Sequence, residues 1–280
     1  MKNKGPDFIS ISPHKTGTSW LYFTLKQHPE IWLPPKKELW ILNQQEISYI
    51  ERIKGYFHLV GMPGDNIKEF FRNSQSLSSL AWWIKFLLYP YKISNYHLFF
   101  PSSRNYIRGD ITPNYYFIKN EIIEKLARVY PTLKIILTIR NPVDRVWSYT
   151  KMHIKEFAKE DISTYNSSKF IKLFDEFKSW WVPYDIVIEK WKKYYPNLLI
   201  LPFDELKNSP YNYLHKVLKY LNANLNFIPG HIEINKIINK SSDQTLSSNL
   251  KIYLYEQYED EIKKLGLYID KIILNNWNNV

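Results

Sequence analysis

The segment P-H-K-T-G-T-S-W at positions 13–20 combines a lysine, a glycine and three hydroxyl side chains. It follows a short apolar run and opens a stretch with helical spacing. Free backbone N–H groups and a partial positive charge at a helix N-terminus bind anions. Gly17 lets the backbone approach an oxyanion closely, and Lys15 adds a full charge. The segment therefore predicts a phosphate-binding loop whose hydroxyl donors are Thr16, Thr18 and Ser19.

The loop differs from the ordinary nucleotide-binding pattern G-x-x-x-x-G-K-[ST]. Its lysine precedes the glycine, and no first glycine stands at the required distance. The structural alternative is a group of Thr and Ser side chains that only caps a helix.

A second anion site is predicted at the end of the most apolar strand, K-I-I-L-T-I at 134–139. Arg140 follows this strand directly, and open α/β sheets bind ligands at that edge. Ser148 lies eight residues further on, in the following helix, where its hydroxyl and the planar donor fork of Arg140 can share a phosphate. The alternative is an ion pair of Arg140 with Asp144 and an exposed Ser148. We interpret Asp144 and Arg145 as structural.

Several motifs resemble those of a known enzyme family. K-T-G-T-S-W-L at 15–21 and the later K-E-L at 37–39 resemble the 5′-phosphosulfate-binding region of sulfotransferases that use 3′-phosphoadenosine 5′-phosphosulfate (PAPS). G-D-I-T-P-N-Y at 109–115 and the segment 134–149 resemble further family motifs in the right order. The carbohydrate-sulfating branch, including the heparan sulfate enzymes, is the most similar.

The resemblance implies transfer of a sulfuryl group from PAPS to a hydroxyl or amine, with a glycan as acceptor and no nucleic-acid partner. It implies that Arg140 and Ser148 hold the 3′-phosphate and that Lys240, in a lysine-rich stretch, covers the adenosine. The remaining cofactor-binding residues it implies are Lys15, Thr16, Gly17, Thr18, Ser19 and Trp20.

The transfer needs a base for the acceptor proton and a cation for the leaving oxygen. Lys15 is the candidate cation. Glu38 is the candidate base by resemblance; the alternative is a solvated carboxylate in a charged run. Asp110 is a second candidate, although the family more often has Glu there. His14 abuts the loop and could donate to a sulfonate, but the favoured interpretation is an incidental histidine at the start of a helix. No H-x-x-H pair occurs, so we expect no catalytic metal.

Two groups of aromatic residues have two interpretations each. Packing of helix faces is favoured over an acceptor-binding wall for the first group, because several members share one helical face. Trp180 and Trp181 have the same ambiguity. The first group comprises Trp82, Trp83, Phe86, Tyr89, Tyr91, Tyr96, Phe99 and Phe100.

Strands and helices alternate along the chain. This pattern predicts an α/β fold in one domain over 1–280, with a P-loop-like central parallel sheet flanked by helices on both faces. We expect a mobile loop at 155–168 and a polar linker at 228–248. The expected strands are 8–12, 106–111, 134–139 and 198–201. The expected helices are 17–27, 45–59, 66–73, 77–89, 116–130, 142–154, 184–194, 210–222 and 246–265.

The 280 residues carry a net charge of +11 and no cysteine. The charge is compatible with a polyanionic glycan but also with the composition of an AT-rich gene. No signal peptide or membrane span is evident, so we expect a cytoplasmic protein. Two alternatives stay open: a P-loop kinase that needs Mg²⁺, and a protein that binds nucleotide or nucleic acid without turnover.

Overall fold

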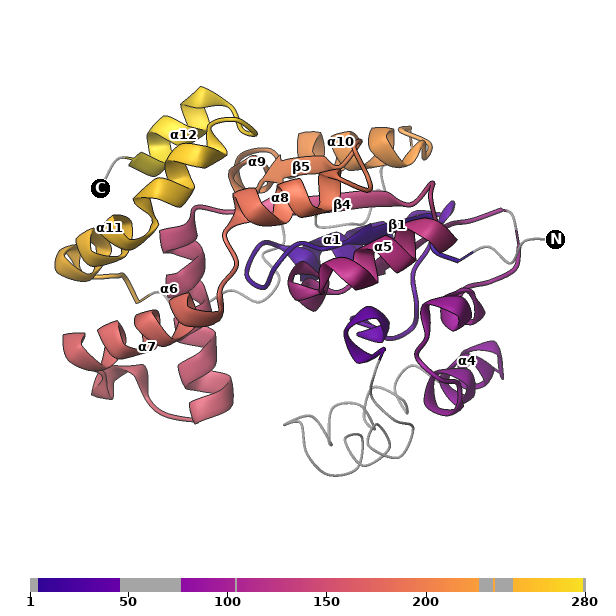
Figure 1. The fold of residues 1–280 in the computed structure, drawn as a ribbon, viewed down its shortest axis with the longest axis horizontal. Coiled ribbons are helices and arrows are strands. Elements are labelled where there is room, and N and C mark those ends of the chain that lie inside the picture. The colour runs from indigo at the N-terminus through magenta and orange to yellow at the C-terminus, as the bar shows by residue number, and fades with distance from the viewer. Residues whose placement is uncertain (1–4, 46–76, 104, 227–233, 235–243, 279–280) are drawn as a thin grey trace.

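The fold is centred on a parallel sheet of five strands, seen in a computed structural model that describes residues 5–45, 77–103, 105–226, 234 and 244–278. The strand order is β2-β3-β1-β4-β5 (Figure 1). The strands are β1 (Phe8–Ser10), β2 (Ile31–Trp32), β3 (Ile107–Ile111), β4 (Lys134–Ile139) and β5 (Leu199–Pro202).

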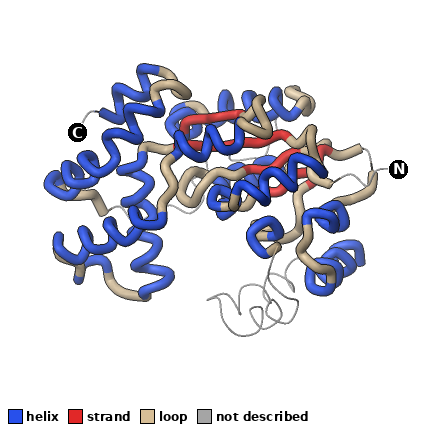
Figure 2. Tube along the Cα trace, in the orientation of Figure 1, coloured by secondary structure: helices blue, strands red, loops and turns tan. Residues whose placement is uncertain are grey.

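Helices make up most of the remaining regular structure (Figure 2). The α-helices are α1 (Thr18–Leu25), α4 (Leu77–Leu88), α5 (Asn120–Val129), α6 (Pro142–His153), α7 (Ser167–Trp180), α8 (Tyr184–Lys192), α9 (Phe203–Asn208), α10 (Pro210–Leu221), α11 (Ser248–Leu265) and α12 (Lys271–Asn278). Short 3₁₀ turns lie at Ile41–Gln44, Ile93–Phe99, Pro113–Phe117 and Ile162–Thr164, and a π-helical turn, η4, spans Ile154–Ala158.

Apolar side chains of the sheet point alternately into two cores. In β4, Ile135 and Leu137 join a core that includes residues of α5 and α8, whereas Ile136 joins a core that includes residues of α1 and α10. Alternate residues of a strand face opposite sides of a sheet. A strand buried on both faces therefore reads as one continuous apolar run, and helices cover both faces, as predicted (Figure 1).

The order of the strands brings together the loops that carry the candidate site. β1 is hydrogen-bonded to β3 on one side and to β4 on the other, with Ser10 opposite Ile136. The chain leaves β1 toward β2 and β3 and then crosses to β4. The loops that follow β1 and β4 therefore meet at the carboxyl edge, where open α/β sheets bind ligands.

Most expected elements are confirmed, with two corrections, whereas β2, α7, α9 and α12 were not expected. The segment 155–168 is not an irregular loop, because it holds the π turn η4, a 3₁₀ turn and the start of α7. The helix expected at 116–130 is α5 alone, since Ile118 and Lys119 are extended and separate it from a 3₁₀ turn. The helices expected at 45–59 and 66–73 lie outside the described residues, apart from Gln45, as does most of the linker at 228–248.

Neither a membrane-spanning helix nor a metal-binding cluster is found within the described ranges. None of their helices has the length and apolar character that crossing a bilayer requires. No three Asp, Glu or His side chains there are placed to hold a metal ion.

Candidate active site

The phosphate loop has a backbone conformation that depends on Gly17. This residue has φ 85° and is the N-cap of α1. A Cβ atom at this position would lie 2.6 Å from Cδ2 of Leu206 in α9. Only glycine combines that φ with so close an approach. No acidic side chain lies in the first turn of α1, so its partial positive charge is available to an anion.

The other loop residues divide between holding the loop and presenting polar groups. The hydroxyl of Thr16 is buried and donates to the carbonyl of Pro13 at 2.6 Å, so it is occupied within the loop. Thr18 and Ser19 lie in the first turn of α1. The indole N–H of Trp20 donates to the carbonyl of Ile234 at 2.9 Å, which ties the start of α1 to a segment 214 residues away.

Arg140 lies beside the phosphate loop, although 125 residues separate it from Lys15 in sequence. Its Nη1 donates to the backbone carbonyl of Lys15 at 3.0 Å, and its guanidinium carbon lies 4.9 Å from the ring centre of Phe203. Nε of Arg140 is buried and has no hydrogen-bond partner among the described residues. Burial lowers the pKa of Arg140. A partly unsatisfied, desolvated guanidinium is suited to an anion.

The alternative interpretation of Arg140 is confirmed in one part and wrong in another. Asp144 Oδ2 lies 4.0 Å from Nη2 of Arg140, at the limit for an ion pair. Ser148 is buried rather than exposed. Arg145 is also buried, with its guanidinium 3.0 Å from the ring centre of Trp181. That packing agrees with a structural role for Arg145.

Lys15 lies among three charged side chains, two of which are cations. Burial lowers the pKa of Lys15 most, the negative charge of Glu156 raises it, and the positive charges of Arg140 and Lys151 lower it. The lysine, the guanidinium and the helix N-terminus therefore fit a ligand that carries phosphate groups. Sequence reasoning missed Lys151, although it follows Ser148 at helical spacing.

Glu38 lies in a tight turn rather than on a solvated surface. Its side chain is only 18% exposed and accepts a hydrogen bond from Nζ of Lys37 at 2.6 Å. Its backbone φ is 66°, a left-handed value that is uncommon outside glycine. The negative charge of Glu38 raises the pKa of His14. The turn thus brings the candidate base close to the phosphate loop.

Asp110 is fully engaged within the fold. It is buried and accepts hydrogen bonds from the hydroxyls of Tyr96 at 2.6 Å, Tyr115 at 2.7 Å and Thr112 at 2.8 Å. Burial raises its pKa, against the effect of these hydrogen bonds. Three donors and no exposed surface leave this carboxylate unavailable to an acceptor. These contacts favour Glu38 over Asp110 as the candidate base.

His14 is joined to the opposite side of the site by Asn114. Its Nε2 lies 2.9 Å from Oδ1 of Asn114, and the carbonyl of Asn114 accepts a hydrogen bond from Asn43 at 2.8 Å. Burial is the largest cause of a lowered pKa at His14, which favours the neutral imidazole. Asn114 was missed as a site residue, although it lies in the motif at 109–115.

The aromatic residues before β3 form core. Packing is confirmed for all of them except Tyr89, which is exposed; the buried residues are Trp82, Trp83, Phe86, Tyr91, Tyr96, Phe99 and Phe100. The two tryptophans at the end of α7 differ from one another. Trp181 stacks on Tyr116, with ring centres 4.7 Å apart, whereas Trp180 is 42% exposed. Lys240 lies outside the described residues.

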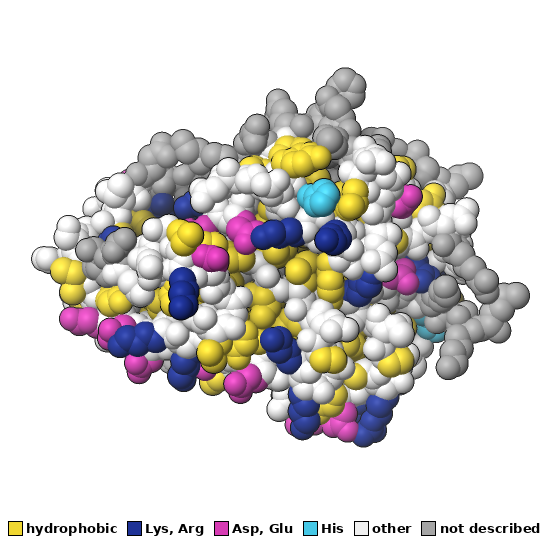
Figure 3. Space-filling view, turned by 90° about the horizontal axis from the view of Figure 1, so that it is seen from above, with side chains coloured by type: hydrophobic (Ala, Val, Ile, Leu, Met, Phe, Trp, Pro, Cys, Tyr) yellow, Lys and Arg dark blue, Asp and Glu magenta, His cyan; other side chains and the backbone are white. Residues whose placement is uncertain are grey.

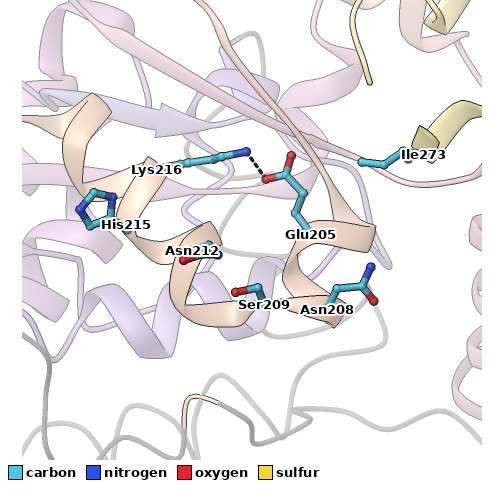
Figure 4. Close-up of a pocket in the computed structure, with 7 residues that line it drawn as sticks. All are labelled: Glu205, Asn208, Ser209, Asn212, His215, Lys216 and Ile273. Atoms are coloured by element: carbon cyan, nitrogen blue, oxygen red, sulfur yellow. Dashed lines mark hydrogen bonds and ion pairs between the residues drawn. The ribbon is translucent and has the colours of Figure 1, made fainter. Parts of the chain in front are cut away.

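A pocket of about 400 Å³ lies beside helices α9, α10 and α12 (Figure 4). Its charged members satisfy one another, since Nζ of Lys216 lies 2.6 Å from Oε2 of Glu205. Its other lining residues are Asn208, Ser209, Asn212, His215 and Ile273. None belongs to the phosphate loop, to the end of β4 or to the Glu38 turn, so this pocket and the candidate site are made of different residues.

Comparisons with known proteins give relatives for both sequence and fold. Mouse bifunctional heparan sulfate N-deacetylase/N-sulfotransferase 4 is 24% identical over 233 residues, which are 77% of this chain and 22% of the mouse protein. Human bifunctional heparan sulfate N-deacetylase/N-sulfotransferase 3 is 24% identical over 227 residues, with the same shares. The chain thus spans about a fifth of the length of the curated relatives it matches.

Two solved structures share the fold. A sulfotransferase from Alicyclobacillus acidocaldarius has a TM-score of 0.63 at 18% identity and covers 97% of this chain and 99% of its own. The sulfotransferase domain from the Synechococcus PCC 7002 olefin synthase has a TM-score of 0.50 at 17% identity, with shares of 91% and 96%. The model described as "Sulfotransferase family" matches residues 6–226. Because that match covers most of the chain, the chain belongs to the sulfotransferase family.

Proposed function

We propose that this chain transfers a sulfuryl group from PAPS to a hydroxyl or amine of a carbohydrate. Membership of the sulfotransferase family supports the reaction class, and the similarity to heparan sulfate N-sulfotransferases supports a glycan acceptor. The observation that carries the proposal is the contact between Arg140 and the Lys15 carbonyl. It joins two cationic sites at neighbouring strand ends, and a nucleotide with both 3′ and 5′ phosphates needs two such sites.

Different residues would bind different parts of the nucleotide. Backbone N–H groups at Gly17, Thr18 and Ser19 would hold the 5′-phosphate at the N-terminus of α1. Arg140 would hold the 3′-phosphate through its unsatisfied Nε, with the buried Ser148 as a second donor. Trp20 would contact the nucleoside.

Transfer requires charge stabilisation and removal of a proton. When bound, PAPS would supply the sulfuryl group, whose S–O bond to the 5′-phosphate breaks as the acceptor oxygen or nitrogen bonds to sulfur. Lys15 holds a positive charge where negative charge develops on the leaving oxygen. Glu38 takes the acceptor proton. His14 is held by a hydrogen bond to Asn114, and its lowered pKa favours the neutral imidazole.

Binding without metal tests the first half of the proposal. Adenosine 3′,5′-bisphosphate in EDTA should raise the melting temperature of the protein, and Lys15→Ala and Arg140→Ala should each weaken that binding at least tenfold. Lys219→Ala, at the end of α10, is the control. Stabilisation by ATP and Mg²⁺ but not by the bisphosphate would instead support a kinase.

Turnover tests the second half. Glu38→Gln should reduce sulfate transfer to a glycan mixture at least a hundredfold and leave bisphosphate affinity within about twofold, because Glu38 acts on the acceptor. Tight bisphosphate binding by the native chain with no transfer to any acceptor would favour a binding protein without turnover.

A further inference from the structure

Four side chains form two connected branches of rings that meet at Tyr149, beside the phosphate loop. We define the aromatic strip as Tyr149, His153, Phe157 and Trp180. The ring centre of Tyr149 lies 6.3 Å from that of His14 and 5.7 Å from that of Trp180. The ring of His153 lies 6.4 Å from Tyr149 and 5.7 Å from Phe157. Ring contacts thus run from the candidate site to the surface.

The geometry of α6 and its π turn aligns this strip. Tyr149, His153 and Phe157 are spaced four residues apart, so one face of the helix carries all three. At about 1.5 Å per residue, the line rises roughly 12 Å. Phe157 lies in η4, and π turns occur frequently at functional sites. The mobile loop expected from the sequence at 155–168 would have given Phe157 no fixed position.

The strip rests on a buried ring from α7. Phe177 is buried, and its ring centre lies 5.0 Å from Tyr149, 5.2 Å from His153 and 5.9 Å from Trp180. The two outer rings remain open to solvent, with Phe157 58% and Trp180 42% exposed. They end the two branches, and Trp180 lies edge-to-face on Tyr149, with 69° between the ring planes. Two separate exposed rings are suited to an extended ligand that places one unit on each. A small apolar molecule would instead require a concave pocket that buries most of its surface.

The outer end of the strip carries no excess of either charge. Lys155 and Lys159 are exposed beside Phe157, but so are Glu156 and Glu160. Balanced charges give no net attraction for a densely charged polyanion. Rings with polar edges and balanced charges match the surface of a sugar chain, which has apolar C–H faces and a polar rim.

We propose that the aromatic strip binds the non-reacting part of a carbohydrate acceptor of low charge density. Sugar rings lie with their C–H faces on Trp180 and Phe157, and the reacting group lies at the His14 end. This inference rests on the proposed sulfuryl transfer to a carbohydrate, and it adds the place and the charge class of the acceptor. It assigns a role to a part of the chain, 155–181, that carries none of the family motifs.

The test measures binding of two hexasaccharides by calorimetry in the presence of adenosine 3′,5′-bisphosphate. The neutral β-1,4-linked hexamer of N-acetylglucosamine should bind the native chain, and Trp180→Ala and Phe157→Ala should each weaken that binding at least tenfold. Trp180→Phe should recover most of the affinity, since it keeps an aromatic ring. A heparin hexasaccharide should bind more weakly than the neutral hexamer at physiological salt.

The matched control is Tyr211→Ala, which removes a similarly exposed ring, 43% accessible, from α10. It should leave hexamer binding unchanged. Every strip variant should keep the native affinity for the bisphosphate, which separates this inference from the proposed function. Failure of the neutral hexamer to bind, or binding that ignores both alanine variants, overturns the inference even if the nucleotide binds. Tighter binding of heparin that is insensitive to Trp180 also overturns it.

Discussion

The backbone on either side of Leu39 has a conformation that non-glycine residues rarely adopt. φ is 66° at Glu38 and 60° at Trp40, and left-handed backbone costs about 1–2 kcal/mol per residue. The N–H of Leu39 donates to the hydroxyl of Thr112 at 3.0 Å, and that hydroxyl donates to Asp110 at 2.8 Å. These hydrogen bonds offset the strain. Asp110 therefore stabilises the turn that presents Glu38, although it does not itself reach the acceptor.

Replacing Asp110 with Asn should separate this positioning role from nucleotide binding. One amide NH₂ would face hydroxyl donors, so at least one buried hydrogen bond is lost, at a cost of about 1–3 kcal/mol. We expect kcat for sulfate transfer to fall at least tenfold and bisphosphate affinity to change less than about twofold. Urea unfolding, calorimetry and transfer rates measure the three quantities.

Asp260→Asn is the control for that substitution, because Asp260 is an exposed carboxyl in α11. It should change neither stability nor turnover. Lower stability of Asp110→Asn with native kcat at a temperature where the variant is fully folded would show that the network serves the fold alone.

Helices α6, α8 and α11 are connected to the end of β4 by a buried chain of contacts. The hydroxyl of Tyr184 in α8 accepts a hydrogen bond from the backbone N–H of Arg140 at 3.3 Å. The N–H of Tyr184 donates to Oε1 of Glu261 in α11 at 2.9 Å. Burial raises the pKa of Glu261 to about 7, against the opposing charge of Arg145. The end of β4, where the second anion site is predicted, is thus braced by a carboxyl whose pKa is raised to about 7.

Glu261 should make stability depend on pH between about 4.5 and about 7. A carboxyl with a higher pKa in the folded protein than in the unfolded chain binds its proton more tightly when folded. Its contribution to stability is therefore present below pH 4.5, the ordinary value, and is lost as the pH rises toward 7. Each pKa unit corresponds to about 1.4 kcal/mol.

Glu261→Gln keeps an acceptor for the Tyr184 N–H and removes the titration. Between pH 5 and pH 7.5 the native protein should lose unfolding free energy relative to the variant, so the variant should become the more stable of the two by comparison with pH 5. Urea titrations at the two values measure it, and Glu259→Gln on the same helix supplies the exposed comparison. A difference that does not change with pH would contradict a raised pKa at Glu261.

The contrast between β4 and α7 explains how much of the fold could be predicted. β4 matches its expected bounds because an apolar run between Pro131 and Asn141-Pro142 has both a clear period and clear ends. In α7, the buried rings of Phe170, Phe174 and Phe177 do have helical spacing, but Lys, Ser and Asp residues between them obscured the pattern. Local apolar periodicity predicts an element only where intervening polar residues do not obscure the pattern.

The sequence predicted the positions of candidate residues that belong to one motif, but it did not predict contacts between distant segments. The residues of the phosphate loop and Arg140 follow from motifs at strand ends. The role of Asp110 depends on Tyr96 and on Leu39, which meets Thr112 across 73 positions of sequence. The spacing of residues along the sequence does not predict a contact between positions so far apart. The same carboxyl in the same motif therefore fits a base and a buried anchor equally well until the packing is known.

On the scale of the whole molecule, the net charge of +11 has two explanations, a general attraction for anions and gene composition. Figure 3 shows a face on which Lys and Arg side chains are spread among acidic and apolar ones and do not form a single patch of one sign. Around Lys15, in contrast, three charges act on the same lysine, two of them the cations Arg140 and Lys151 and the third the carboxylate of Glu156. We therefore expect the position of charge, and not its total, to govern nucleotide binding.

Two double variants that each remove two positive charges test this expectation. Lys193 and Lys219 are exposed. Lys193 follows α8, and Lys219 lies in the last turn of α10. The carbonyl of Tyr220, beside Lys219, accepts a hydrogen bond from Lys134 at the first residue of β4, away from the carboxyl edge. Lys193→Gln/Lys219→Gln should keep bisphosphate affinity within about twofold. Lys15→Gln/Arg140→Gln should lose at least a hundredfold, since each charge-assisted hydrogen bond contributes about 1.5–3 kcal/mol.

The dependence of binding on salt makes the comparison sharper. Screening at roughly 10 Å in 0.1 M salt suppresses the field of distant charges but not direct contacts. The native chain and Lys193→Gln/Lys219→Gln should therefore both keep most of their affinity for the bisphosphate between 50 and 500 mM NaCl, whereas the residual binding of Lys15→Gln/Arg140→Gln, which rests on distant charges, should fall much more steeply with salt. Equal losses of affinity in the two double variants at low salt would mean that total charge, and not the contact between Arg140 and the phosphate loop, determines binding.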